Sequence, residues 1–154
     1  MNLILLDPTE LTKEGSAHLR GPRAAHILNV LKATRGKTLR IGLLDGPRGL
    51  ATVQSATEET VELDCAFDLT TPPRPRIDLL LALPRPKVMR RLWAQLSALG
   101  VGQIILTNAE RVEKPYFDTH ILDVDCYRPL LLEGLQQAGD TRLPMVSIHR
   151  RFKV

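Results

Sequence analysis

Residues 81–112 read LALPRPKVMRRLWAQLSALGVGQIILTNAERV and decide the fold of the second half of the chain. An apolar segment leads into a basic loop, an amphipathic segment follows, and Gly100 precedes a second apolar segment, Gln103–Thr107. This order predicts a strand, a helix and a second, parallel strand, which together form a β-α-β unit. Because open α/β sheets bind ligands where their strands end, the cations after the first strand are candidates for ligand binding.

The same pattern extends to both sides of this unit. The nearly continuous apolar run 77–83 predicts a strand that is buried on both faces of a parallel sheet. A second helix is predicted over about residues 119–138, where Pro129 indicates either a kink or a start near Asp125. Residues 145–148 predict a third, shorter strand. The second half is therefore predicted to be an α/β domain.

The first 71 residues predict a different architecture, a small, closed or partly closed β-barrel with one helix. The helix is predicted between Pro22, which suits an early helical position, and Gly36. Compact barrels hide their sheet edges and often bind nucleic acids. The five predicted strands are residues 3–6, 17–20, 37–44, 51–56 and 61–67.

A proline-rich stretch separates the two patterns. Three prolines occur within the four positions 72–75, and such a run favours a short extended linker. We therefore predict a barrel over residues 1–71, a linker over residues 72–75 and the α/β domain over residues 76–154.

The composition excludes several classes of protein. With 44% hydrophobic and 25% charged residues among 154, the chain is typical of soluble globular proteins rather than disordered ones. No apolar run approaches the roughly 20 residues that span a bilayer, and the start lacks the features of a signal peptide, so a cytoplasmic location is predicted. Cys65 and Cys126 lie far apart without histidines at ligand spacing, and no metal site is predicted.

Positive charge is concentrated in the second half. Residues 1–72 hold 8 Lys and Arg against 9 Asp and Glu, whereas residues 73–154 hold 13 against 8. Such an excess suggests a polyanionic partner, although charge alone leaves a solvated basic face equally open. The placement of four cations favours the partner. They surround the predicted helix start, where they oppose the helix dipole but where unpaired N–H groups attract phosphate, and they are Arg85, Lys87, Arg90 and Arg91.

Other motifs are less informative. Glu110 and Arg111 follow a predicted strand end, where a ligand site and a surface ion pair remain open alternatives. His26 has no second ligand that would complete a metal site. No Ser/His/Asp arrangement, nucleophile elbow or P-loop is present, so hydrolytic functions have no support.

Taken in order, these segments resemble the RsmE family, the 16S rRNA (uracil-N3)-methyltransferases, over nearly the whole chain. In the first half the resemblance rests on residues 26–32, residues 35–37 and the Asp45-Gly46 turn. In the second half it rests on Ala82-Leu83-Pro84 with Lys87, Leu99-Gly100-Val101, Glu110-Arg111, Gln137-Ala138-Gly139 and Arg142-Leu143-Pro144.

The resemblance implies a PUA-like RNA-binding barrel followed by a SPOUT-type α/β-knotted domain. It also implies S-adenosylmethionine as methyl donor, methylation of a uridine N3 in 16S rRNA of the small ribosomal subunit, and a homodimer. No residue can be named as the catalytic base. The candidate RNA-binding residues are Arg23, His26, Lys32, Arg85, Lys87, Arg90, Arg91, Arg111 and Arg142.

The chain also departs from the family pattern. Ile27 replaces a second histidine, Gln136 and Ala138 replace Glu and Ser, and Lys37 replaces Asp. The chain stops at Val154, before the Gly-rich segments that form the knot and hold the donor in the family. We therefore expect either a fragment of a longer protein or a chain that pairs with a missing portion. In both cases a sheet edge and one helix face would be exposed, the donor site would be missing and this chain would be inactive alone. The alternatives are a truncated RNA-binding module without activity and an unrelated α/β protein with an incidental basic face.

Overall fold

The computed structural model describes residues 3–68 and 70–151. The chain divides into two compact units, Met1–Pro72 and Pro73–Val154, which are described separately below. The division falls inside the proline-rich stretch.

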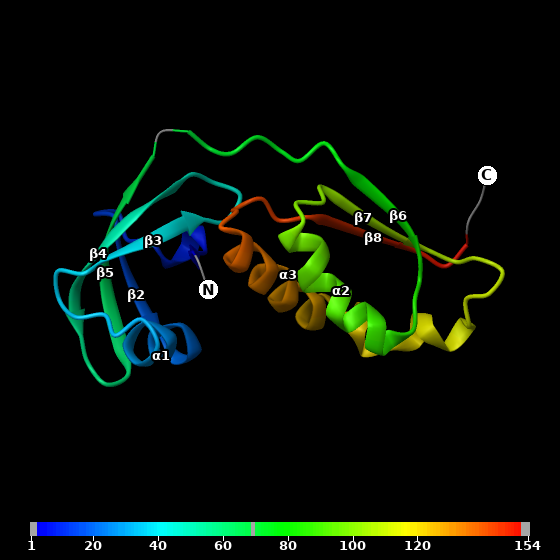
Figure 1. The fold of residues 1–154 in the computed structure, drawn as a ribbon, viewed down its shortest axis with the longest axis horizontal. Coiled ribbons are helices and arrows are strands. Elements are labelled where there is room, and N and C mark those ends of the chain that lie inside the picture. The colour runs from blue at the N-terminus through cyan, green and yellow to red at the C-terminus, as the bar shows by residue number, and fades with distance from the viewer. Residues whose placement is uncertain (1–2, 69, 152–154) are drawn as a thin grey trace. The chain divides into compact units, whose positions relative to one another are not determined.

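The first unit is a curled, five-stranded half-barrel (Figure 1). Its strand order is β1-β3-β4-β5-β2, with β1 parallel to β3 and the other neighbours antiparallel. Because β1 and β2 lie at opposite ends of this order, the sheet is partly closed rather than a complete barrel. Its elements are β1 (Ile4–Leu6), η1 (Pro8–Glu10), β2 (Ser16–Arg20), α1 (Gly21–Asn29), β3 (Thr38–Leu43), β4 (Arg48–Ala56) and β5 (Thr60–Phe67).

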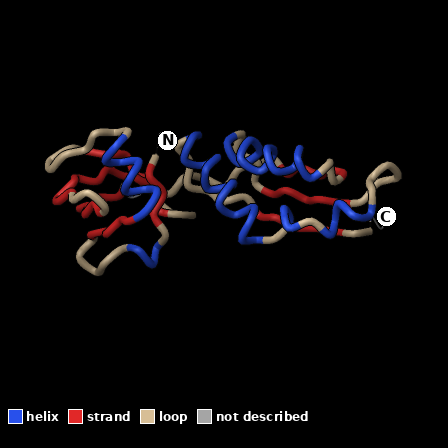
Figure 2. Tube along the Cα trace, turned by 90° about the horizontal axis from the view of Figure 1, so that it is seen from below, coloured by secondary structure: helices blue, strands red, loops and turns tan. Residues whose placement is uncertain are grey.

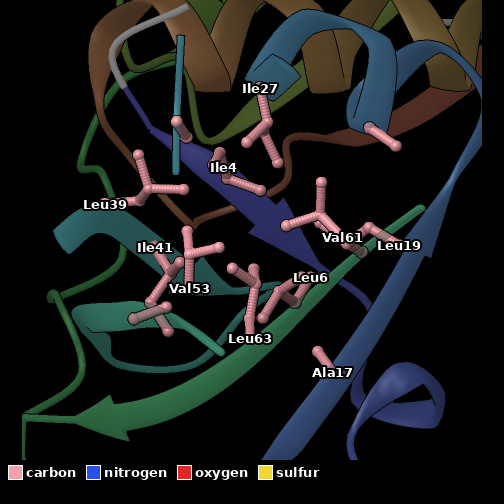
Figure 3. Close-up of a cluster of buried hydrophobic side chains, with 13 residues drawn as sticks. Ile4, Leu6, Ala17, Leu19, Ile27, Leu39, Ile41, Val53, Val61 and Leu63 are labelled. Carbon is pink, nitrogen blue, oxygen red and sulfur yellow. The ribbon is translucent and has the colours of Figure 1, made fainter. Parts of the chain in front are cut away.

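Alternation along the strands builds the core of this unit. In β3, Leu39 and Ile41 are buried while Thr38 and Arg40 are exposed, as expected for a sheet with one face in the interior. Figure 3 shows the buried side chains of the strands pointing toward one another, with Ile27 of α1 among them. The helix begins at Gly21, with Pro22 at the early helical position that was predicted, and it ends at Asn29, before Gly36.

An ion pair joins α1 to the first strand and the short helix that follows it. Arg23 Nη1 donates to Glu10 Oε2 and to the carbonyl of Leu5, both at 2.9 Å, and Nη2 also pairs with Glu10. Glu10 in turn accepts from the N–H of Asp7 at 2.8 Å and completes the capping box of η1. One carboxylate thus holds three segments of the half-barrel together.

The second unit contains the predicted β-α-β unit and its extension. Its three strands form a parallel sheet of order β6-β7-β8, and β7 lies at its centre. The helix after the 3-10 segments begins at Val124, close to the predicted start near Asp125. The elements are β6 (Asp78–Ala82), α2 (Pro86–Ala98), β7 (Gln103–Thr107), η2 (Lys114–Asp118), η3 (His120–Leu122), α3 (Val124–Ala138) and β8 (Met145–His149).

Both long helices of this unit cover the same face of the parallel sheet (Figure 2). Ile104 and Leu106 of β7 are buried beneath them. Trp93 of α2 is fully buried, and its Nε1 donates to the carbonyl of Ile121 at 3.1 Å. The core of this unit therefore lies between β7 and the two helices.

The opposite face of the sheet corrects one expectation. The run 77–83 was expected to be buried on both faces, yet Leu80 is 54% and Ile77 is 65% exposed. Met145 at the start of β8 is also 54% exposed. Because β6 is an edge strand and α2 and α3 share one face, the described residues leave the second face uncovered. The prediction that this strand is buried on both faces was therefore wrong for β6.

A glycine sets the close approach of α2 and α3. A Cβ added at Gly134 would lie 2.2 Å from the backbone oxygen of Ala94 and 2.9 Å from the Cβ of Ser97. At the same crossing, Ser97 Oγ donates to the carbonyl of Leu131 at 2.7 Å. The two backbones are therefore packed too tightly for any side chain at this position.

We expect Gly134→Ala to destabilise the second unit. Alanine favours a helix over glycine by about 1 kcal/mol, but the clash with a backbone oxygen outweighs this gain and leaves a net loss of roughly 2 kcal/mol. Trp93 is the single tryptophan, so its fluorescence during urea unfolding reports on this unit alone. Glu133→Ala on the same helix, at an exposed position, serves as control and is expected to change little; equal midpoints for both variants would contradict the close-packing account.

We expect the contribution of Glu10 to disappear in acid. Its hydrogen bonds with Arg23 hold the pKa of the Glu10 carboxyl below its ordinary value of 4.5. A carboxyl with a lowered pKa stabilises the fold fully above its unfolded pKa and loses this effect as the pH falls through the folded pKa. At pH 7, Glu10→Gln should cost about 1 kcal/mol.

Amide hydrogen exchange of residues 4–10 measures this local stability. The difference between the wild type and Glu10→Gln should shrink as the pH falls from 7 to below 4. Glu14→Gln, at an exposed position, is the control. A difference that persists unchanged in acid would show that the charge of Glu10 is not the cause.

Candidate nucleic-acid interface

The carboxyl ends of β6, β7 and β8 meet at one edge of the parallel sheet, which we call the C-terminal rim. The rim comprises residues 83–87, 108–118 and 149–151. It carries six Lys or Arg side chains against three carboxylates. A ligand that reached this rim would therefore meet an excess of positive charge next to the start of α2.

The turn from β6 into α2 fixes the first cations of the rim. The N–H of Leu83 donates to the carbonyl of Thr107 at 2.9 Å, which extends the pairing of β6 with β7 by one residue. Pro84 and Pro86 then flank Arg85, the N-cap residue, whose side chain makes no capping hydrogen bond. The exposed Arg85 is thereby placed at the start of α2, where the helix dipole is positive.

Three further predicted cations lie on one surface of α2. Lys87, Arg90 and Arg91 are all exposed. Spacings of three and four residues place Lys87 next to both arginines on the helix surface. The first turns of α2 therefore present a basic strip that continues from Arg85.

The loop after β7 adds polar groups to the same rim. Asn108 Oδ1 accepts from the N–H of Ala109 at 2.9 Å, and the N–H of Val112 donates to the carbonyl of Ala109 at 3.0 Å. This tight turn exposes Glu110 and Arg111. Because β6 and β7 are parallel, the loop after β7 lies at the same rim as the turn after β6. Arg111 therefore joins Arg85 and Lys87 at the rim.

Arg142 occupies a different place. It lies between the end of α3 and the start of β8, at the opposite edge of the parallel sheet. The strands between the two edges have five residues, or roughly 17 Å. The structure therefore does not bring Arg142 together with Arg85 and Arg111, and its predicted role in RNA binding stays a separate prediction.

The predicted residues of the first unit have mixed surroundings. Arg23 already binds Glu10 and the Leu5 carbonyl, so its charge is engaged within the fold. Lys32 is exposed, with a left-handed φ of 50°. His26 is half-buried, and its Nε2 has no hydrogen-bond partner among the described residues. Lys32 is the most accessible of the three for a phosphate.

A hollow of about 560 Å³ lies in the first unit between the start of α1 and the turn from β4 to β5. It is lined by Arg20 and Gly21 on one side and by Glu58 and Glu59 on the other. Because two carboxylates face one guanidinium there, the hollow does not favour a phosphate. The basic surface of the second unit is the better candidate for anion binding.

The residue pattern left several rim groups unnoticed. Tyr116 follows β7, and its hydroxyl donates to Glu113 Oε1 at 2.7 Å. Arg150 follows β8 and donates to Asp118 Oδ1 at 2.8 Å and to the carbonyl of Phe117 at 3.1 Å. The rule that strand ends share one rim, applied to all three strands, would have found them.

In residues 3–68 and 70–151, no group of three or more His, Cys, Asp and Glu side chains is placed to hold a metal ion. Among the same residues, no helix is both long and apolar enough to cross a membrane.

The family model of the RNA methyltransferase domain matches residues 71–154, which include the whole basic rim. The chain belongs to the RsmE family of RNA methyltransferases. Over 96% of its length it is 32% identical to the ribosomal RNA small subunit methyltransferase E of Treponema pallidum. Over 99% of its length it is 26% identical to methyltransferase E 1 of Borreliella burgdorferi.

The solved structure of a relative has the same fold. A ribosomal RNA small subunit methyltransferase E from Neisseria gonorrhoeae, bound to S-adenosyl methionine, superposes with a TM-score of 0.72 at 19% identity. The match covers 97% of this chain and 62% of that structure. The chain spans 56% and 63% of the lengths of the two sequence relatives.

Proposed function

We propose that this chain is the RNA-binding portion of an S-adenosylmethionine-dependent 16S rRNA methyltransferase that modifies a uridine at N3. The half-barrel would be a PUA-like RNA-binding domain, and the second unit would be the first part of a SPOUT-type domain. The partner is the small ribosomal subunit in the cytoplasm, and the full-length protein would be a homodimer. The family membership and the basic rim support this proposal.

One observation carries the RNA-binding part of the proposal. Four exposed cations lie from the N-cap of α2 along its first turns, and Arg111 joins them from the loop after β7. Helix starts normally select acidic residues, yet the first turn of α2 has none. A polyanion that neutralises these cations removes the electrostatic cost of this placement.

The rim residues do not by themselves fit the methyl donor. An adenosine site needs an apolar, enclosed cleft with a few polar groups, whereas Arg85, Glu110, Arg111 and Glu113 are all exposed and charged. We therefore assign the described rim to RNA and derive no step through the donor. The alternative that this segment binds RNA without catalysis agrees with the same geometry.

The chemistry of the target base suggests what the rim contributes. Methylation at uracil N3 requires loss of the N3 proton, and negative charge then develops on the two neighbouring oxygens. Guanidinium groups such as those of Arg85 and Arg111 stabilise such charge by donating hydrogen bonds. No described residue is assigned as the base.

Charge reversal on α2 tests the RNA interface. We expect Arg90→Glu combined with Arg91→Glu to weaken binding of a 16S rRNA fragment by about 10- to 100-fold at 50 mM salt, and to lower the slope of log affinity against log salt by about 2. Fluorescence anisotropy of labelled RNA provides the measurement.

The matched control is Lys13→Glu combined with Arg40→Glu in the first unit. It changes the net charge equally at two exposed positions far from the rim in sequence. Equal losses in both double variants would mean that RNA binding is not specific to α2, because net charge or the half-barrel would then account for the affinity. Wild-type protein without salt-dependent RNA affinity would identify the rim as an incidental basic surface and contradict the proposed function.

Calorimetry with S-adenosylmethionine tests whether the rim binds RNA and not the methyl donor. Because the described rim residues Arg85, Glu110 and Arg111 are exposed and charged, this chain should give no measurable heat of binding at micromolar donor concentrations. Micromolar affinity would contradict the assignment of the rim to RNA alone and would favour an active enzyme over an RNA-binding segment.

A further inference from the structure

Polar contacts hold the short helix η2 on the C-terminal rim. The Tyr116 hydroxyl donates to Glu113 Oε1 at 2.7 Å, and the N–H of Tyr116 donates to the carbonyl of Glu113 at 3.0 Å. The charge of the Arg85 guanidinium, from the turn after β6, also acts on this phenol. Glu113, the residue before η2, therefore holds the phenol in place with a cation nearby.

On the side of β8, Arg150 binds the end of η2. Arg150 donates to the Phe117 carbonyl at 3.1 Å and to Asp118 Oδ1 at 2.8 Å. Its guanidinium carbon also lies 5.8 Å from the centre of the Phe117 ring, which suits a cation–π contact. Glu113 before η2 and Arg150 after β8 thus fix the residues around Tyr116 in the absence of any ligand.

Tyr116 differs from its neighbour in accessibility. Phe117 is only 8% exposed and belongs to the core, whereas Tyr116 packs against that core but remains partly exposed. The hydrogen bond to Glu113 raises the pKa of the Tyr116 phenol, so the ring stays neutral at physiological pH. The rim therefore presents a fixed, uncharged aromatic ring among exposed cations.

We propose that Tyr116 is a stacking platform for an unpaired base of the RNA, with Arg85 and Lys114 beside it for the flanking phosphates. This inference rests on the proposed RNA-binding function. It specifies that the ligand is a single-stranded nucleotide of the RNA. An aromatic ring that stacks on a base contributes about 1–3 kcal/mol and does so for any base. The cations contribute through the salt-dependent release of counterions.

The two contributions can be separated with a labelled decauridylate and the full chain. Tyr116→Leu keeps apolar bulk against the core but has no aromatic face, and it should bind about 5- to 20-fold more weakly with an unchanged salt slope. Tyr116→Phe should bind within about 3-fold of the wild type, because the stacking face is kept. Arg85→Gln should instead lower the salt slope by about 1.

A spectroscopic variant provides a second readout. In Tyr116→Trp the new indole should be quenched when decauridylate binds, whereas the buried Trp93 of the wild type should not respond. Trp93 emission in every other variant also shows whether the second unit is folded.

The outcomes distinguish the platform from the proposed function. Wild-type affinity in Tyr116→Leu, together with lost affinity in the Arg90→Glu and Arg91→Glu double variant, would overturn the platform and leave the RNA interface standing. A chain that binds no RNA at all would overturn both. Equal weakening in Tyr116→Phe and Tyr116→Leu would assign the effect to the hydroxyl and would also exclude stacking.

Discussion

Parallel pairing of β6, β7 and β8 is the constraint on which the second unit depends. It requires crossover helices between the strands, and α2 and α3 supply them on one face of the sheet. It also brings all three carboxyl ends to one rim, so that residues far apart in sequence, such as Arg85 and Arg150, follow strand ends at the same edge of the sheet. The candidate interface is a direct consequence of strand direction.

Much of this arrangement could be predicted from the sequence because its signals are local. The strand 103–107 coincides with β7, and Gly139 ends α3 in the left-handed conformation. The basic turn before α2 was recognisable because two prolines and four cations stand together. The existence and order of the elements follow from apolar periodicity and from such stop signals.

Other features could not be predicted because they depend on contacts that are distant in sequence. The exposure of Leu80 depends on which face the helices cover, and an apolar run does not reveal this. The engagement of Arg23 depends on Glu10, which is brought to it by the fold. The role of Tyr116 could not be predicted for a related reason. An aromatic content of 4% describes the whole chain and does not say where a single ring lies in the fold. Composition argues against broad aromatic platforms but not against a single ring on a rim.

The strand order of the half-barrel has a consequence for synthesis on the ribosome. β3, β4 and β5 form a local meander, whereas β1 and β2 are made first and pair with β3 and β5. The buried side chains Leu3–Leu6 therefore emerge well before their partners exist. Such delayed, non-local pairing slows folding and leaves apolar segments exposed in the meantime. During synthesis the first unit thus passes through a stage in which β1 is exposed, although the same side chains are buried in the finished unit.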